Sequence, residues 1–207
     1  GVHSGAASRI VPPSVRIIRQ LLDRVEDVVT GAVLVPEANV AIPDYRRAEA
    51  EGTAQAAPGE ASEFPLLPGM STAVDRDADA LLARTWQPTL SYIGIDGIPP
   101  IARAGNVLRP ATAIKLSMRI PPTADPQAVR AGLTSLLEAD PPYGAAVTFD
   151  QTEAAPGWNA PDLSPWLRRA LDDASQAVFG RPTQLMGEGG TIPFMGMLGQ
   201  QFPEAQF

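Results

Sequence analysis

Apolar residues recur at three- and four-residue spacing between Ser14 and Val29, which is the pattern of a helix with one buried face. The apolar positions are Val15, Ile18, Leu21, Leu22, Val25, Val28 and Val29. Gly31 follows them at a place where a glycine can end a helix in the left-handed conformation. We therefore predict a helix over 14–29 and a short strand over 32–35.

Further segments carry the signals of regular structure. Apolar and polar residues alternate over 89–95 and over 111–120, which predicts two strands. Asp125 suits the N-cap of a helix and Pro126 its first position, and apolar residues at helical spacing continue to Leu137. The segment 145–149 is predicted as another strand.

The order of these elements predicts the fold. With a first strand that contains His3, the order is strand, helix, strand, strand, helix, strand. Such a βαββαβ order is typical of the ferredoxin-like two-layer sandwich, an α+β fold in which two helices cover one face of a sheet. We assign residues 1–155 to this domain, with a loop insertion around 37–75. Small residues with little to bury occupy 52–62 of that insertion, and 75–86 can form a short helix.

The last 50 or so residues do not fit the sandwich. Ser164 is placed to cap a helix that begins at Pro165, and Gly180 is placed to end it. A glycine turn and a last apolar helix, from Ile192 to about Leu198, follow. We interpret 156–207 as a helical segment of an incomplete α/β catalytic domain.

Composition limits the classes of function. Hydrophobic residues make up 44% and charged residues 19% of the 207 residues, which is enough for a buried core. The net charge of −7 argues against nucleic acid as a partner, and no apolar run approaches the ~20 residues of a membrane-spanning helix. The chain has no Cys, which excludes a thiolate metal site and is compatible with a cytoplasmic protein. Gly1 is interpreted as an interior residue of a longer protein, because an initiator Met is absent.

Three short motifs occur in a fixed order along the chain. They are His3-Ser4-Gly5, then Asn106 with Pro110 and a strand ending in Arg119, then Glu188-Gly189-Gly190-Thr191-Ile192-Pro193. In this order they resemble the dinuclear-zinc amidohydrolases and dipeptidases, the group of aminoacylase, carnosine dipeptidase and succinyl-diaminopimelate desuccinylase.

The resemblance implies a role for each motif. His3 would reach from the dimerisation (lid) domain into the active site of the partner subunit and stabilise the oxyanion of the tetrahedral intermediate. Asn106 and Arg119 would bind the carboxylate end or backbone of the substrate, for which the planar fork of arginine is suited. Gly190 and Thr191 would hold the substrate carboxylate with a backbone amide and a hydroxyl group.

The resemblance also implies a metal centre that this chain cannot supply. The family holds two zinc ions per subunit with histidines and carboxylates on other segments, whereas this chain has one histidine. We therefore expect a fragment of a homodimeric zinc peptidase or amidohydrolase that hydrolyses a dipeptide or an N-acyl amino acid. By itself the fragment is expected to bind no zinc tightly and to be inactive.

The residues alone leave other interpretations open. His3 can be a surface or turn histidine, Arg119 a solvated arginine at a strand end, and Asn106 a turn residue. The glycine motif can be a structural turn. A non-catalytic ferredoxin-like binding or oligomerisation module is then the alternative. Gly187 stands where the family usually has Arg, which leaves substrate preference open and slightly favours a catalytically dead relative.

Overall fold

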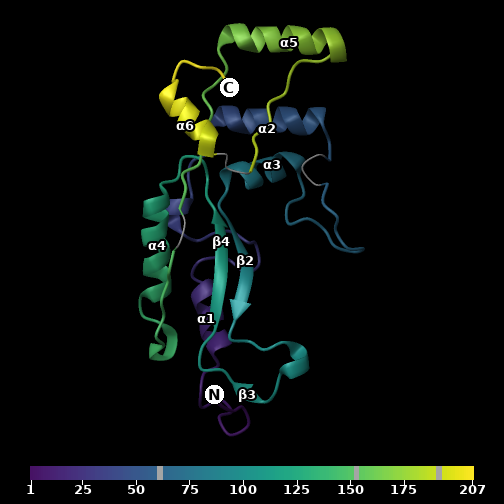
Figure 1. Ribbon diagram of the computed structural model, residues 1–207. Helices are drawn as coiled ribbons and strands as arrows, with labels where there is room; N and C mark the ends of the chain where they lie inside the picture. Colours follow the sequence, from purple (N-terminus) through teal and green to yellow (C-terminus); the bar gives the residue numbers. More distant parts are fainter. Residues whose placement is uncertain (60–62, 152–153, 190–192) are drawn as a thin grey trace. The chain divides into compact units, whose positions relative to one another are not determined.

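The computed structural model describes residues 1–59, 63–151, 154–189 and 193–207 (Figure 1). The chain forms two compact units, and each is built from segments that are far apart in the sequence. Unit 1 contains 1–39, 88–120 and 125–154, and unit 2 contains 40–87, 121–124 and 155–207. Helices and strands are both present and the sheets are small, as in an α+β fold. None of the described helices is both long and apolar enough to cross a lipid bilayer.

The first helix of unit 1 is shorter than predicted. Helix α1 spans Ser14–Leu22, so the prediction of a helix to Val29 is wrong for its last two turns. The carboxylate of Asp27 accepts hydrogen bonds from the amides of Val29 and Thr30, at 3.0 and 2.7 Å, and so closes a local turn that competes with the helix. Val28 and Val29 are consequently 82% and 88% exposed.

Gly31 ends that turn rather than a helix. Its φ of 72° lies in the left-handed region, as predicted, and the chain then reverses into a tight hairpin. Glu26 and Val33 form a β-bridge across the hairpin, and the Leu34 amide donates to the Val25 carbonyl at 2.7 Å. The predicted strand at 32–35 is therefore reduced to a single bridge.

Unit 1 contains two antiparallel pairs of strands. Strand β1 (Val2–His3) pairs with β3 (Val107–Leu108), and β2 (Thr89–Asp96) pairs with β4 (Ala113–Arg119) over its whole length. The strands predicted over 89–95 and 111–120 are thus confirmed (Figure 1). Each sheet of the described residues has two strands, and the four-stranded ferredoxin-like sheet stays a prediction.

The strand predicted at 145–149 is wrong. These residues form no strand, although their exposure alternates as in a half-buried strand. The amide of Phe149 donates to the Glu138 carboxylate at 2.6 Å, so a side chain occupies the position of a ladder partner. Alternation of apolar residues predicts a buried side but not the presence of a neighbouring strand.

Helix α4 (Pro126–Glu138) contributes one buried face to the core of unit 1. The Asp125 carboxylate accepts from the Gln127 amide at 2.9 Å, which confirms the predicted N-cap. Val129, Leu133 and Leu137 are buried on one face, and the helix packs against α1 and the 3₁₀ turn η1 (Pro36–Ala38). The guanidinium of Arg24 donates to three carbonyls at the end of α4, those of Leu136, Ala139 and Asp140.

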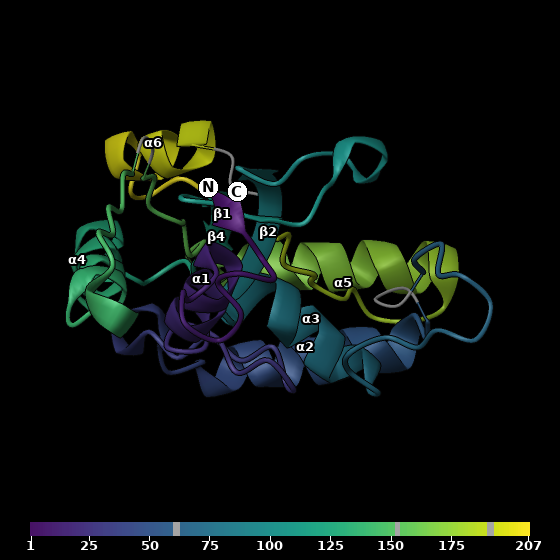
Figure 2. The ribbon, with the colours of Figure 1, turned by 90° about the horizontal axis from the view of Figure 1, so that it is seen from below.

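Unit 2 has a helix where the sequence predicts an insertion loop. Helix α2 (Asp44–Ala56) lies beside α3 (Asp77–Trp86) in both views (Figure 1, Figure 2), so the expectation of weak order over this part of 37–75 is wrong. The buried residues of this helix pair form one cluster: Ala50, Ala78, Leu81, Leu82 and Trp86. Thr53 is also buried, and its hydroxyl donates to the Leu185 carbonyl at 2.8 Å. Because its buried positions are small residues, α2 has weak apolar periodicity.

The carboxyl-terminal helices of unit 2 begin and end close to the predicted residues. Helix α5 spans Pro165–Phe179, and Gly180 ends it with a φ of 71°. Ser164 occupies the N-cap position, but its hydroxyl makes no capping hydrogen bond. Helix α6 spans Pro193–Gln201, and Ile192, its predicted first residue, lies outside the described residues.

Candidate functional site

His3 stands on an exposed edge that a local turn holds in place. The His3 carbonyl accepts from the Ala7 amide at 3.1 Å, and the His3 Nδ1 accepts from the Gly5 amide at 3.2 Å. In the neutral ring, an Nδ1 atom that accepts a hydrogen bond leaves the proton on Nε2. The side chain is exposed, and Nε2 has no partner among the described residues. In its neutral form the exposed ring therefore has Nε2 as its one donor.

Asn106 lies beside His3. Pairing of β1 with β3 places His3 opposite Val107, and the Ser4 amide donates to the Asn106 carbonyl at 2.9 Å. The Asn106 side chain is exposed. Two polar residues from distant parts of the sequence are thus brought together at one end of unit 1.

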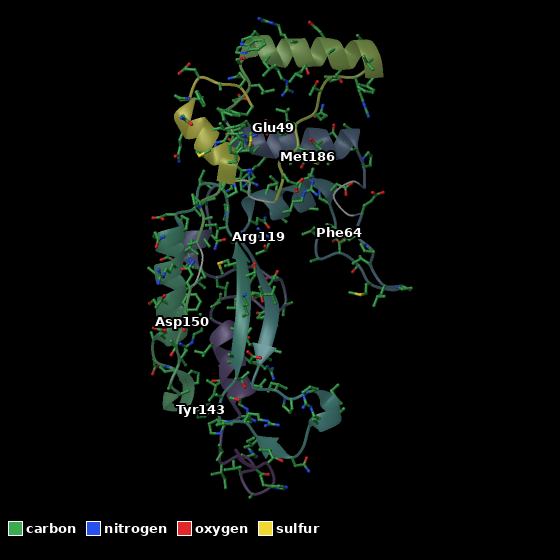
Figure 3. The ribbon with its side chains drawn as sticks, viewed as in Figure 1. Glu49, Phe64, Arg119, Tyr143, Asp150 and Met186 are labelled. Atoms are coloured by element: carbon green, nitrogen blue, oxygen red, sulfur yellow. The ribbon has the colours of Figure 1, made fainter. Side chains whose placement is uncertain are left out.

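Arg119 lies at the opposite end of the β2–β4 ribbon from His3. It is the last residue of β4, where Figure 3 labels it, and it pairs with Thr89. Its side chain is exposed and has no hydrogen-bond or ion-pair partner among the described residues. At about 3.3 Å per residue, the two ends of β4 are about 20 Å apart. Residues 109–112 connect β3 to the beginning of β4, so one chain does not bring His3 and Arg119 together.

Gly190 and Thr191 lie outside the described residues, but the segment before them is described. The Gly189 amide donates to the Glu188 carboxylate at 3.0 Å. A Cβ atom at Gly189 would stand 2.6 Å from the Arg84 carbonyl oxygen, and one at Gly187 would stand 3.0 Å from Thr85 Cγ2. The 187–189 segment therefore passes directly over the last turn of α3, and Gly189 is at a position where a side chain does not fit.

The described residues do not form a metal centre. No group of three or more histidine, aspartate or glutamate side chains among them stands close enough to hold a metal ion. His3 is the single histidine of the chain and its Nδ1 accepts a backbone hydrogen bond. The described residues therefore do not provide the set of ligands that two zinc ions require.

Tyr92 has the most strongly shifted pKa value among the described residues. Partial desolvation of the phenol group and its hydrogen bond to Glu26 Oε2, at 2.7 Å, raise the pKa of Tyr92 to about 12. This bond ties β2 to the hairpin that follows α1. It joins residues far apart in the sequence, and no sequence motif could have predicted it.

Arg84 is a second residue that sequence reasoning missed. Its Nε atom is buried and has no hydrogen-bond partner, and its Nη2 donates to the Met186 sulfur at 3.1 Å. An arginine on a predicted helix carries no local signal for this position beside the glycine motif.

Comparison with known proteins supports the resemblance. No family model matches the chain. The chain is 25% identical over 138 residues to the cysteinylglycine-S-conjugate dipeptidase of Corynebacterium striatum, and the aligned part is 67% of this chain and 30% of that protein.

Solved structures with the same fold include human carnosine dipeptidase 1, with a TM-score of 0.67, 21% identity, and coverage of 96% of this chain and 42% of that one. For the di-peptidase Dug1p of Saccharomyces cerevisiae the TM-score is 0.66 and the identity 19%, and the match covers 98% of this chain and 42% of that one. For the M20 family metallo-carboxypeptidase Sso-CP2 of Sulfolobus solfataricus the TM-score is 0.64 and the identity 17%, and the match covers 99% of this chain and 46% of that one. The resemblance predicted from the motifs is confirmed, and the chain spans less than half the length of these relatives.

Proposed function

We propose that this chain is the dimerisation and substrate-capping part of a zinc-dependent peptidase or amidohydrolase that hydrolyses the amide bond of a dipeptide or an N-acyl amino acid. The observation that carries the proposal is the exposed His3 ring, held as a donor beside Asn106 in a chain with the fold of dipeptidases. In this proposal residues 1–155 include the lid domain, with a ferredoxin-like arrangement, and 156–207 belong to a catalytic domain.

His3 would act on the active site of the partner subunit. Its Nε2 proton would be donated to the oxygen that becomes negatively charged when water attacks the scissile carbonyl. One positioned donor of this kind typically lowers the barrier by about 3 kcal/mol, which is a factor of about 100 in rate. Action in trans is supported by the separation of His3 from Arg119, which stands at the far end of β4 within one chain.

Arg119, Asn106, Gly190 and Thr191 would bind the carboxylate end of the substrate. Arg119 has its guanidinium free among the described residues, and a free planar fork can form two parallel hydrogen bonds with a carboxylate. Asn106 would act from the same subunit as His3, since the β1–β3 pair positions both.

The rest of the parent protein would hold two zinc ions per subunit, which would supply the activated water. The homodimer would form through the lid domain, where nearly the whole of β2 is exposed. We expect the parent to be cytoplasmic. The chain alone would then be inactive and would retain no zinc after dialysis, and elemental analysis that finds one zinc per chain would contradict this.

The decisive experiment replaces His3 by Ala in the full-length protein. We expect kcat for a dipeptide to fall about 100-fold while the zinc content stays unchanged. Mixing His3→Ala subunits with subunits that lack a zinc ligand tests action in trans, because only a mixed dimer would combine an intact metal site with an intact His3. Unchanged kcat in the His3→Ala protein would refute the proposed role.

The second candidate is a non-catalytic binding or oligomerisation module. The exposed apolar side chains of β2, Tyr92, Ile93 and Ile95, favour a surface used for association. This candidate predicts that His3→Ala leaves every measured activity unchanged and that substitutions on β2 abolish self-association.

A further inference from the structure

The loop between β2 and β4, residues 97–112, is closed at its base and tied to β1. Its two ends meet at the last pair of the β2–β4 ladder, and a Cβ atom on Gly97 would collide with the Ala111 carbonyl oxygen. The returning limb of the loop contains β3, which pairs with the strand of His3. A loop of this size whose ends are in contact forms a compact unit of its own. The loop and His3 therefore belong to one arrangement within unit 1.

The loop presents apolar side chains to solvent on a turn that is held in place. This 3₁₀ turn, η3 (Ile101–Arg103), lies at the end of unit 1 where the N-terminus also lies (Figure 1). The Arg103 amide donates to the Pro100 carbonyl at 2.8 Å, and the Ala104 amide donates to the Ile101 carbonyl at 3.1 Å. Ile101 is 96% exposed, the highest value of any large hydrophobic residue that the structure describes, and Ile98 is also exposed. Neighbouring apolar side chains exposed in this way are typical of a contact surface.

The charge of the loop favours an acidic partner. Residues 97–112 include Arg103 and Arg109 and no Asp or Glu, whereas the whole chain has a net charge of −7. The Arg103 side chain is exposed, and within the described part of the chain it has no hydrogen-bond or ion-pair partner. A basic loop on an acidic chain is electrostatically complementary to a second copy of that chain.

We propose that the 97–112 loop packs against the partner subunit, beside the active site that His3 enters. Ile101 is the apolar contact of the loop, and Arg103 is its ionic contact. The inference rests on the proposed function, because His3 acts in trans there and the pairing of β1 with β3 carries the loop toward the same subunit. It adds a second contact to the association of the lid domains through β2, and it makes Ile101 a positioning residue for His3.

Photo-cross-linking in the full-length protein tests the contact. The photoreactive residue p-benzoylphenylalanine replaces Ile101 in one variant and Leu67 in the control, because Leu67 is an apolar residue of similar size that is exposed on unit 2. We expect irradiation to give covalent dimers of the Ile101 variant alone, with the cross-link on a peptide of the catalytic domain. Absence of the covalent dimer, equal yields from the two variants, or a cross-link between the two 97–112 loops would overturn the proposal.

The variant Ile101→Ser measures the strength of the contact. Burial of one isoleucine side chain typically strengthens association by a factor of about 10 or more, and a two-fold symmetric dimer contains the contact twice. We therefore expect the dissociation constant of the dimer, measured by sedimentation equilibrium, to rise about 100-fold. Activity should fall at low protein concentration and return at high concentration, which a misfolded variant would not do. Leu67→Ser should change neither quantity, and an unchanged dissociation constant in Ile101→Ser would contradict the contact.

These results separate failure of the contact from failure of the proposed function. A cross-link at position 101 with an unchanged kcat in His3→Ala keeps the contact and refutes the catalytic role of His3. A lowered kcat in His3→Ala without a cross-link at position 101 keeps the catalytic role and refutes the contact.

Discussion

Replacing Arg24 by Ala removes the arginine that holds the end of α4. The guanidinium donates from Nη1 to the carbonyls of Leu136 and Ala139, at 3.1 and 2.7 Å, and from Nη2 to that of Asp140, at 2.9 Å. The last carbonyls of a helix have no partner within the helix, and a cation at that end also interacts favourably with the helix dipole. All three bonds are therefore specific to the folded state.

The expected loss follows from these contacts. A hydrogen bond from a charged donor contributes about 1.5–3 kcal/mol when it is buried, but two of these three acceptors are exposed and water can replace the arginine there. We therefore expect the free energy of unfolding to fall by about 2 kcal/mol in total. For a unit of about 100 residues this lowers Tm by roughly 8–16 °C.

Urea and thermal unfolding followed by circular dichroism measure this loss. Arg16→Ala is the matched control, because Arg16 is exposed on α1 and has no partner among the described residues. Hydrogen exchange at the last turn of α4 should become faster in the Arg24 variant alone. Equal unfolding midpoints for the two variants would refute the assigned role of Arg24.

Two further predictions concern single contacts. The pKa of Tyr92 is raised from 10.0 to about 12, so the folded state favours the neutral phenol. Its contribution to the free energy of unfolding is present below pH 10 and is lost as the pH rises through 12. Absorbance titration of tyrosinate should show one late phase, which Glu26→Gln moves to lower pH; an unchanged phase would refute the hydrogen bond. On α6, Gly199→Ala should destabilise unit 2 by about 1–2 kcal/mol, because its Cβ would stand 2.8 Å from Trp158 Nε1. Gly196→Ala should be neutral or stabilising by up to about 1 kcal/mol, because its Cβ would meet Trp158 at an ordinary 3.7 Å, and urea unfolding followed by tryptophan fluorescence separates the two.

Elements with local signals were predicted well. Helix α4 begins at the proline that follows its capping aspartate, and Gly180 ends α5 in the left-handed conformation. The helix predicted from Ser14 was extended too far, because periodicity continued through residues that the turn at Asp27 removes from the helix. Helix α2 was missed because its buried positions are an alanine and a threonine, which give no apolar stripe.

The candidate site was predicted as a set of residues but not as an arrangement. The motifs identified His3, Asn106 and Arg119, and the fold comparison confirms the resemblance they suggested. His3 and Asn106 are neighbours because β1 pairs with β3. No local sequence pattern indicates that pairing. Arg84 was not identified, because its position beside Met186 depends on contacts between distant segments.

Sequence by itself determined where most helices begin and end and which residue types can act as donors to a substrate. Caps, prolines, glycines and helical spacing act within a few residues, so their effect does not depend on the rest of the chain. Tertiary structure decided which strands pair, that α2 exists, and which polar groups become neighbours. Those outcomes depend on the entropy cost of closing long loops and on the free energy gained by burying apolar surface between segments such as 44–56 and 77–86. Neither quantity is a property of one segment alone.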